Sequence, residues 1–175
     1  MKKFILLFFL MPAFLAFGQS REVTLRSVLL TQLKSTHSEK DWFVPVNVAV
    51  GGLTGEQASA VLKEGNHSVG QLAYHLLFWN ERILKQFKGE PAGAFDGDNS
   101  ETFDKFTEEQ WNQTVTKLDQ VLSEMEKVVE NAPDDRLKEL APTIANVCTH
   151  NAYHVGQIIY LRKLQGNWDP EKGVK

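Results

Sequence analysis

Two histidines stand four residues apart in the stretch THNAYHVGQI, residues 149–158. Residues at this spacing lie one above the other on the same face of a helix, so His150 and His154 could hold one metal ion between them. Imidazole nitrogen is a common ligand of zinc-like ions. Two inward-facing histidines also fit an ordinary helical core, in which each ring makes one hydrogen bond. The pair by itself therefore leaves both interpretations open.

A third histidine on an earlier helix favours the metal site. At 100° per residue, His154 shares the inward face of its helix with His150, Val147 and Ile158. His75 lies at the edge of the apolar arc of the earlier helix, where a helix passes from the core to a groove. A catalytic zinc site typically has three protein ligands and leaves one position for water or substrate. The predicted metal ligands are therefore His75, His150 and His154.

Three imidazoles are neutral ligands, so the ion would keep its full charge and lower the pKa of a water or thiol ligand. The alternative is a bundle without a metal, in which three separate polar partners satisfy the three rings. No catalytic residue can be assigned, because Glu81 lies on the helix of His75 but points about 120° away from it. His67, beside a predicted helix cap, and His37, at the end of the first helix, are predicted to be polar surface residues.

The elements that position these side chains are predicted to be helices, because apolar residues recur at intervals of three and four and strand signals are scarce. Three helices begin with a hydroxyl residue followed three positions later by glutamine, which is the capping-box pattern; the hydroxyl residues are Thr54, Ser68 and Thr107. The stretch 46–52 is predicted to be a loop. The predicted helices span residues 21–37, 55–63, 69–88, 108–131 and 142–166, with Pro142 in the first turn of the last one. The predicted fold class is all-α, a four-helix bundle with one extra short helix.

Two further expectations concern packing. The first helix is expected to bury Val23, Leu25, Val28, Leu29 and Leu33. The segment 89–107 is too long for a minimal turn and could form a lid over a site. The apolar residues Phe95, Phe103, Phe106 and Trp168 either pack the loops onto the bundle or cover a partner subunit.

The first 18 residues are predicted to be a cleaved signal peptide. Lys2 and Lys3 precede an apolar run over residues 4–17, and the small residues Ala16 and Gly18 suit a cleavage site. A membrane anchor is the alternative, but the run contains 14 residues and a span needs about 20. We therefore expect a mature domain over residues 19–175 that is exported, periplasmic or secreted, without a stable membrane anchor.

Composition narrows the class of protein and partner. The chain of 175 residues is 42% hydrophobic and 23% charged, which fits one globular domain and argues against a disordered or fibrous protein. Its formal charge of −3 becomes −5 when Lys2 and Lys3 leave with the signal peptide, so nucleic acid is a disfavoured partner. Cys148 is the only cysteine, so the chain has no internal disulfide, and we expect the thiol to be buried as a small apolar group.

The histidine motifs occur in two longer strings, HSVGQLAYHL at residues 67–76 and HNAYHVGQIIYLRKLQG at residues 150–166. Together these strings resemble the DinB-like (DinB/YfiT) metalloenzyme superfamily over essentially the whole mature chain. The resemblance implies a four-helix bundle with a divalent metal, commonly nickel or zinc. It also implies that one histidine of the second helix, His75, and two of the fourth, His150 and His154, hold the metal.

The resemblance implies an enzyme without fixing its reaction. Members of the superfamily include transferases and isomerases that depend on low-molecular-weight thiols, and members often form dimers, so a homodimer is a further expectation. Such thiols are chiefly cytosolic, whereas this chain carries an export signal. We therefore expect an exported metal-dependent enzyme, either a hydrolase or a thiol-dependent transferase, that acts on a small-molecule substrate. The alternative is a non-catalytic helical module that binds a metal or a ligand.

Overall fold

The computed structural model describes residues 22–104 and 106–174. Within these residues the regular secondary structure is entirely helical. The elements are α1 (Leu25–His37), α2 (Val46–Val50), α3 (Gly55–Ser59), α4 (Val69–Lys88), α5 (Glu101–Asp104), the 3-10 helix η1 (Glu108–Gln110), α6 (Trp111–Asn131), α7 (Asp134–Leu164) and the 3-10 helix η2 (Pro170–Lys172). The predicted all-α bundle of four long helices is confirmed, but the described residues add three short α-helices where one was predicted.

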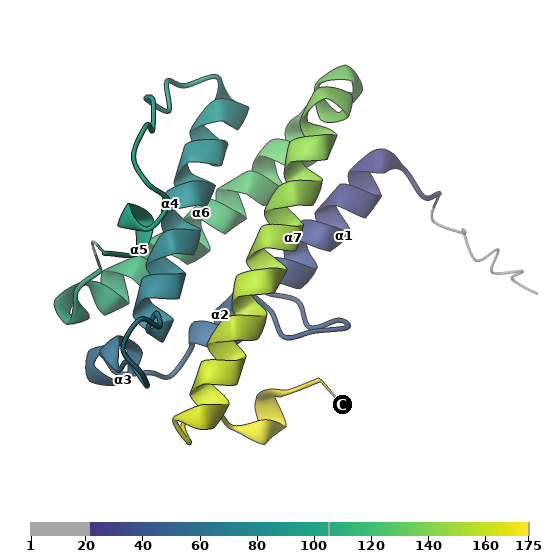
Figure 1. The fold of residues 1–175 in the computed structure, drawn as a ribbon. Coiled ribbons are helices and arrows are strands. Elements are labelled where there is room, and N and C mark those ends of the chain that lie inside the picture. The colour runs from purple at the N-terminus through teal and green to yellow at the C-terminus, as the bar shows by residue number, and fades with distance from the viewer. Residues whose placement is uncertain (1–21, 105, 175) are drawn as a thin grey trace, which may run out of the picture.

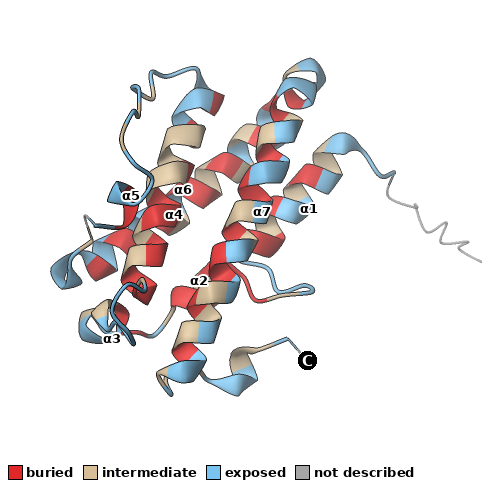
Figure 2. Cartoon of the chain, in the orientation of Figure 1, coloured by how far each residue is buried: buried red, intermediate tan, exposed pale blue. Residues whose placement is uncertain are grey.

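The four long helices pack as a bundle (Figure 1). Helix α4 packs against α6 and α7, and α1 packs against the same two helices. The helices therefore close a ring in the order α1, α6, α4, α7, and their apolar faces meet inside it (Figure 2). This core includes Leu33 of α1, Leu76 of α4, Leu122 of α6 and Ile158 of α7, each at most 1% exposed.

The predicted capping boxes set the beginnings of three helices. In each box the glutamine Oε1 accepts a hydrogen bond from the backbone N–H of the hydroxyl residue, as Gln71 does from Ser68 at 2.9 Å. Helix α4 has the predicted bounds, and it ends at Gly89, whose φ of 71° is the left-handed conformation that glycine adopts without strain. Sequence signals at the beginning of a helix are therefore reliable here. The predicted ends are less so, because α3 ends at Ser59 instead of residue 63, and the box at Thr107 opens the 3-10 helix η1, after which α6 begins at Trp111.

The first helix begins later than predicted and buries fewer residues. It starts at Leu25 behind a capping box of Thr24 and Ser27. Val23 is 80% exposed, and Leu25 and Val28 are also exposed, so those three predictions are wrong. Leu29 and Leu33 are buried as predicted. Near its N-terminus α1 is fixed by Arg26, whose guanidinium donates to backbone oxygens at the end of α6.

The stretch predicted as a loop after α1 contains a short helix, α2. Val46, Ala49 and Val50 of this helix are buried in the core. Its last carbonyls accept hydrogen bonds from the buried guanidinium of Arg162, which reaches Ala49 O at 2.6 Å and Gly51 O at 3.0 Å. A cation more than a hundred residues away in the sequence thus satisfies the unpaired carbonyls at the end of α2. For this reason the local sequence did not predict the helix.

Helix α7 is longer than predicted, since it begins at Asp134 and contains Pro142 in its interior. Proline lacks a donor and its ring clashes with the preceding turn, at a cost of about 3 kcal/mol. Leu137, Leu140 and Ile144 are buried on both sides of the proline in one continuous apolar face. Burial of that face offsets the cost, so the prediction that Pro142 opens the helix was wrong.

His37 is buried at 4% exposure, so the prediction of a surface residue was wrong. Its Nδ1 lies 2.6 Å from Glu126 Oε1 and its Nε2 lies 3.0 Å from Asp119 Oδ1. The side-chain amide of Asn47 also donates to Asp119, at 2.6 Å. Burial opposes the charged form, but the hydrogen bonds to the two carboxylates outweigh it and raise the pKa of His37. We call this group the His37 cluster; it ties α1 and α2 to α6.

Predictions about the N-terminal segment and Cys148 have different outcomes. The predicted signal peptide, residues 1–18, lies outside the described residues. Among the described residues, no helix is both long and apolar enough to cross a bilayer. Cys148 is buried as predicted, and burial raises the pKa of its thiol to about 11.

Candidate metal centre

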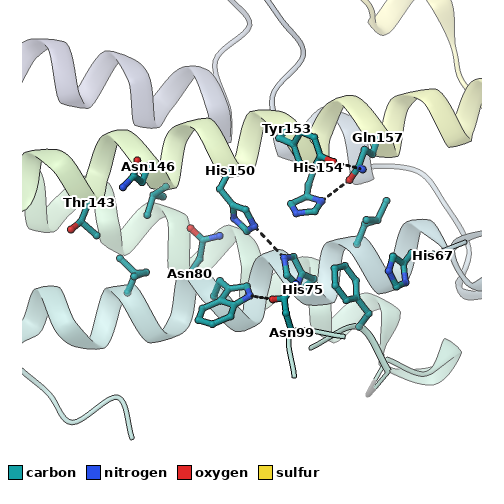
Figure 3. A pocket seen from close by; sticks show the side chains of 15 residues that line it. His67, His75, Asn80, Asn99, Thr143, Asn146, His150, Tyr153, His154 and Gln157 are labelled. Carbon is teal, nitrogen blue, oxygen red and sulfur yellow. Dashed lines mark hydrogen bonds between the residues drawn. The ribbon is translucent and has the colours of Figure 1, made fainter. Parts of the chain in front are cut away.

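A cavity of about 770 Å³ lies between α4 and α7 and is closed on one side by the segment that follows α4. This volume is within the range of small-molecule sites, about 300–1,000 Å³. Figure 3 shows the lining side chains, with His75 on α4 facing His150 and His154 on α7. The predicted histidines therefore lie at one cavity rather than dispersed through the core.

The three histidines converge to a degree that could hold one metal ion. One ring nitrogen from each lies within 4.8 Å of the other two. His75 Nε2 and His150 Nε2 are 3.1 Å apart. Tetrahedral zinc with bonds of about 2.0–2.1 Å places two ligand nitrogens about 3.4 Å apart, so this pair has nearly the required separation. His75 and His154 are buried and His150 is half-buried, which leaves one side of the cluster open to the cavity.

A hydrogen bond fixes the tautomer of His75. The hydroxyl of Thr102, on α5, donates its one hydrogen to Asn99 O at 2.6 Å. The same oxygen lies 2.5 Å from His75 Nδ1, so it accepts a hydrogen bond from that nitrogen. In a neutral imidazole the other nitrogen, Nε2, then carries a lone pair and no hydrogen. His75 therefore presents the form that a metal ligand requires.

His154 has the same arrangement with a different partner. Its Nδ1 lies 2.7 Å from Oε1 of Gln157, an oxygen that only accepts, so Nδ1 carries the hydrogen. The Gln157 amide nitrogen in turn donates to the Tyr153 hydroxyl at 3.2 Å. Outer partners of this kind orient a ligating imidazole and fix its tautomer. Sequence reasoning did not find Thr102 as a partner of His75.

The surroundings keep the three rings neutral. Burial, with smaller repulsion from His154 and His150, lowers the pKa of His75 to about 3. Burial and repulsion from His150 lower the pKa of His154 to about 4, against the opposing effect of the hydrogen bond that His154 donates to Gln157. Burial also lowers the pKa of His150. Metal ligands must be deprotonated at the ligating nitrogen, so three neutral imidazoles fit a divalent ion at neutral pH, once the hydrogen that joins His150 Nε2 to His75 Nε2 moves to His150 Nδ1.

The segment between α4 and α6 covers the cluster from one side, as expected of a lid. Phe103 is buried and stacks on His75 with ring centroids 4.0 Å apart. On its other face it stacks on His67 at 3.9 Å. His67 thus lines the cavity as a half-buried side chain instead of lying on the surface as predicted, although it does not join the three converging nitrogens.

The same segment is also fastened to the second half of α4. Arg82 donates to Gly93 O at 2.7 Å, and the Trp79 indole donates to Asn99 Oδ1 at 3.3 Å. Phe95 packs edge-on against Trp79, with ring centroids 5.5 Å apart. These contacts bring Asn99 to the cavity wall and hold Thr102 beside His75. Thr102, which lies 27 residues from His75 in the sequence, thus determines its tautomer, and no local pattern indicates this.

The apolar residues singled out in the sequence for loop packing or subunit contact pack on their own chain and are buried or half-buried. Besides Phe95 and Phe103, Phe106 lies edge-on to Trp111 and fills the space where a side chain at Gly70 would stand. Trp168 lies over the guanidinium of Arg162, 5.3 Å from ring centroid to carbon. This favours loop packing as their role.

The described residues that line the cavity include no aspartate, glutamate, lysine or arginine. Glu81 is not among them, in agreement with its predicted direction. A carboxylate base of the kind common in zinc hydrolases is therefore not supplied by these residues. Besides the three converging imidazoles, His67 and Tyr153 are the lining groups that can transfer a proton.

Comparison with known proteins identifies the family. A sequence model described as the DinB superfamily matches residues 46–158, a span that includes His75, His150 and His154. No curated protein and no solved structure matches the chain. The matched span is more than half of the chain, and the bundle has the helical class that the resemblance implied. The chain belongs to the DinB superfamily.

Proposed function

We propose that the chain is an exported enzyme that binds a divalent metal ion through His75, His150 and His154 and acts on a small molecule. Zinc and nickel are among the divalent ions that imidazole ligands suit. The observation that carries the proposal is the convergence of three neutral imidazoles at the wall of an open cavity. Membership of the DinB superfamily supports the same ligand set.

When bound, the ion supplies Lewis-acid chemistry, which polarises an oxygen of the substrate or lowers the pKa of a water or thiol. The residues of the chain prepare the site for that chemistry. Thr102 and Gln157 hold the hydrogens of His75 and His154 on Nδ1. Phe103 stacks on His75 and covers one side of the cluster. His67 and Tyr153 are placed to accept or donate a proton at the cavity wall.

Hydrolysis and thiol transfer both fit this arrangement. In either reaction one face of the cluster must remain open to the reacting groups, and His150 is half-buried on the side that faces the cavity. A metal that only joins α4 to α7 would not need a cavity of this size. The cavity therefore favours an enzyme over a non-catalytic module, which remains the competing interpretation.

Metal content of the untagged protein tests the first part of the proposal. We expect about one zinc or nickel ion per chain by elemental analysis, and its loss from His154→Ala. Panels of esters, lactones and thiol acceptors then test catalysis with the metal-loaded protein. Turnover that disappears in His154→Ala supports an enzyme. A metal-loaded protein that is inert on every panel supports the non-catalytic module.

Export is a separate part of the proposal. The charge, apolar run and small residues of positions 1–18 support a cleaved signal peptide, with Gln19 as the mature N-terminus. N-terminal sequencing of the protein from periplasmic and culture fractions tests this. A chain recovered from the cytoplasm with Met1 intact would contradict export without affecting the metal site.

A further inference from the structure

The cavity combines a large volume with an absence of formal charge in its described lining. Fifteen described residues line it, and their polar groups are amides, hydroxyls and imidazoles. The remainder is aromatic or aliphatic, including Trp79, Ile83 and Val147. Apart from a metal ion, this lining offers no charged group that could pair with a charge on a ligand.

This composition limits what can bind. A carboxylate, phosphate or ammonium that leaves water without a charged partner loses hydration that hydrogen bonds to neutral groups only partly replace. A divalent ion held by neutral imidazoles can pair with one anionic group, at one point of the cavity. A second charge on the same ligand would lie against Asn146, Thr143 or the apolar wall.

The cavity extends past the histidines along the helices. Figure 3 shows Thr143 and Asn146 on one side of His150 and Gln157 on the other, all on α7. Trp79 and Ile83 of α4 also line this cavity, and both follow His75 on that helix. We call the part bounded by Trp79, Ile83, Thr143, Asn146 and Val147 the neutral arm. It has room and apolar surface for the body of a ligand whose reactive group reaches the histidines.

We propose that the site takes a small molecule with one metal-binding group and an uncharged, mainly apolar or aromatic body that lies in the neutral arm. This inference rests on the proposed function, because it assumes the metal. It excludes substrates that carry further charges, such as phosphate esters and peptide-like thiols with several carboxylates. Of the two proposed reactions, it favours hydrolysis of a neutral ester, amide or lactone over transfer from such a thiol.

A matched set of hydroxamic acids tests the inference, because the hydroxamate binds the metal and the ring carries the variable group. The probes are benzohydroxamic acid and its para-substituted methyl ester, carboxylate and trimethylammonium derivatives. With zinc-loaded protein, calorimetry should give similar Kd values for the parent and the methyl ester. We expect the carboxylate and the trimethylammonium probes to bind at least tenfold more weakly. Charged probes that bind as well as the ester would overturn the proposal.

A charge placed in the neutral arm sharpens the test. Thr143 is half-buried and lines the arm, so Thr143→Arg should supply the missing partner and bring the carboxylate probe to within about threefold of the ester. Thr143→Gln is the neutral control of similar length and should preserve the discrimination. An unchanged preference in a folded, zinc-loaded Thr143→Arg protein would contradict the arm as the place where the body lies.

The outcomes separate this inference from the proposed function. If the protein holds zinc but binds none of the four probes, the substrate class is wrong and the metal site stands. If the protein holds no zinc or nickel, the proposed function fails first. Elemental analysis of each sample before calorimetry distinguishes the two results.

Discussion

Among the described residues, buried histidines lie at two places, the candidate metal centre and the His37 cluster. The two environments shift the histidine pKa in opposite directions. At the candidate metal centre, burial lowers the pKa of His75 to about 3. In the His37 cluster, hydrogen bonds to Glu126 and Asp119 outweigh burial and raise the pKa of His37. The two side chains are similarly buried, at 2% and 4% exposure. Burial alone therefore does not explain the difference.

The hydrogen-bond partners of each ring explain the opposite pKa shifts. Thr102 at His75 and Gln157 at His154 are neutral acceptors that occupy Nδ1 and leave Nε2 for another ligand. At His37, one carboxylate contacts each ring nitrogen, so the charged form is favoured and no nitrogen is left for a metal. The first cluster is therefore the one that could hold a metal ion, whereas the second forms a structural ion pair. Changes in the two clusters should accordingly affect different properties.

The largest expected effect is the loss of metal from the candidate centre. Replacing one of three ligands, as in His150→Ala, should weaken zinc affinity by more than about 100-fold, beyond what the loss of an outer partner typically causes. Competition with a chromogenic chelator measures the affinity. His37→Gln is the matched histidine control and should bind zinc as the unaltered protein does. Equal losses in both variants would abolish the distinction between the clusters.

The next effect concerns the hydrogen bond that sets the tautomer of His75. Thr102→Val keeps the shape of the side chain but removes the oxygen that accepts from Nδ1. Loss of such an outer partner should reduce zinc affinity about 10–100-fold. Thr102→Ser retains the hydroxyl and should restore most of the affinity in the same chelator assay. If the Thr102→Val and Thr102→Ser proteins bind zinc equally well, the hydroxyl does not position His75.

The difference between the clusters also shows what local sequence can predict. The convergence of the candidate ligands His150 and His154 follows from helix periodicity, and the place of His75 follows from its position at the edge of an apolar face. The role of His37 could not be predicted in this way, because Glu126 and Asp119 lie 89 and 82 residues away on another helix. Thr102 was missed for the same reason, since a loop brings it to His75.

In the fold, too, the elements set by local signals were predicted and those that depend on distant residues were not. The capping box at Ser68 predicted the beginning of α4, and the helix ends as predicted before the left-handed Gly89, because signals at a helix end act within one turn of the chain. Helix α2 and the first part of α7 were not predicted. The former depends on Arg162, which is distant in sequence, and the latter on burial of Leu137 and Leu140 ahead of Pro142. Packing between helices overrode the local rule in both places.

A smaller effect is expected on stability when the His37 cluster is broken. His37→Gln removes at least one charge-assisted hydrogen bond to a carboxylate, which typically contributes about 1.5–3 kcal/mol. Asp119 is half-exposed, so solvent screens its interaction with His37. We therefore expect His37→Gln to lower the free energy of unfolding by about 2 kcal/mol in total. Thermal unfolding of the zinc-loaded protein should show a Tm lower by about 4–8 °C. A Tm within 1 °C of the unaltered protein would show that the cluster contributes little.

The smallest expected effect is the pH dependence of the difference in Tm between the unaltered protein and His37→Gln. The folded pKa of His37 lies above the ordinary value of 6.5, so folding favours the protonated ring. Its contribution is complete below about pH 6.5 and is lost as pH rises through the raised pKa. Asp119 behaves in the opposite way: hydrogen bonds from His37 and Asn47 lower its pKa from 3.8, so its contribution is complete above that value and is lost in stronger acid.

The stabilisation by the His37 cluster should therefore be greatest between about pH 4 and pH 6.5 and decline above this window. Differential scanning calorimetry of the unaltered protein and His37→Gln at pH 5.5 and pH 9 measures it, with Tm differing by more at pH 5.5. Because both proteins keep the same metal centre, the pH dependence of zinc binding cancels in the comparison. A Tm difference that grows towards pH 9 would mean that His37 acts as a neutral ring, and the contrast between the two clusters would then be lost.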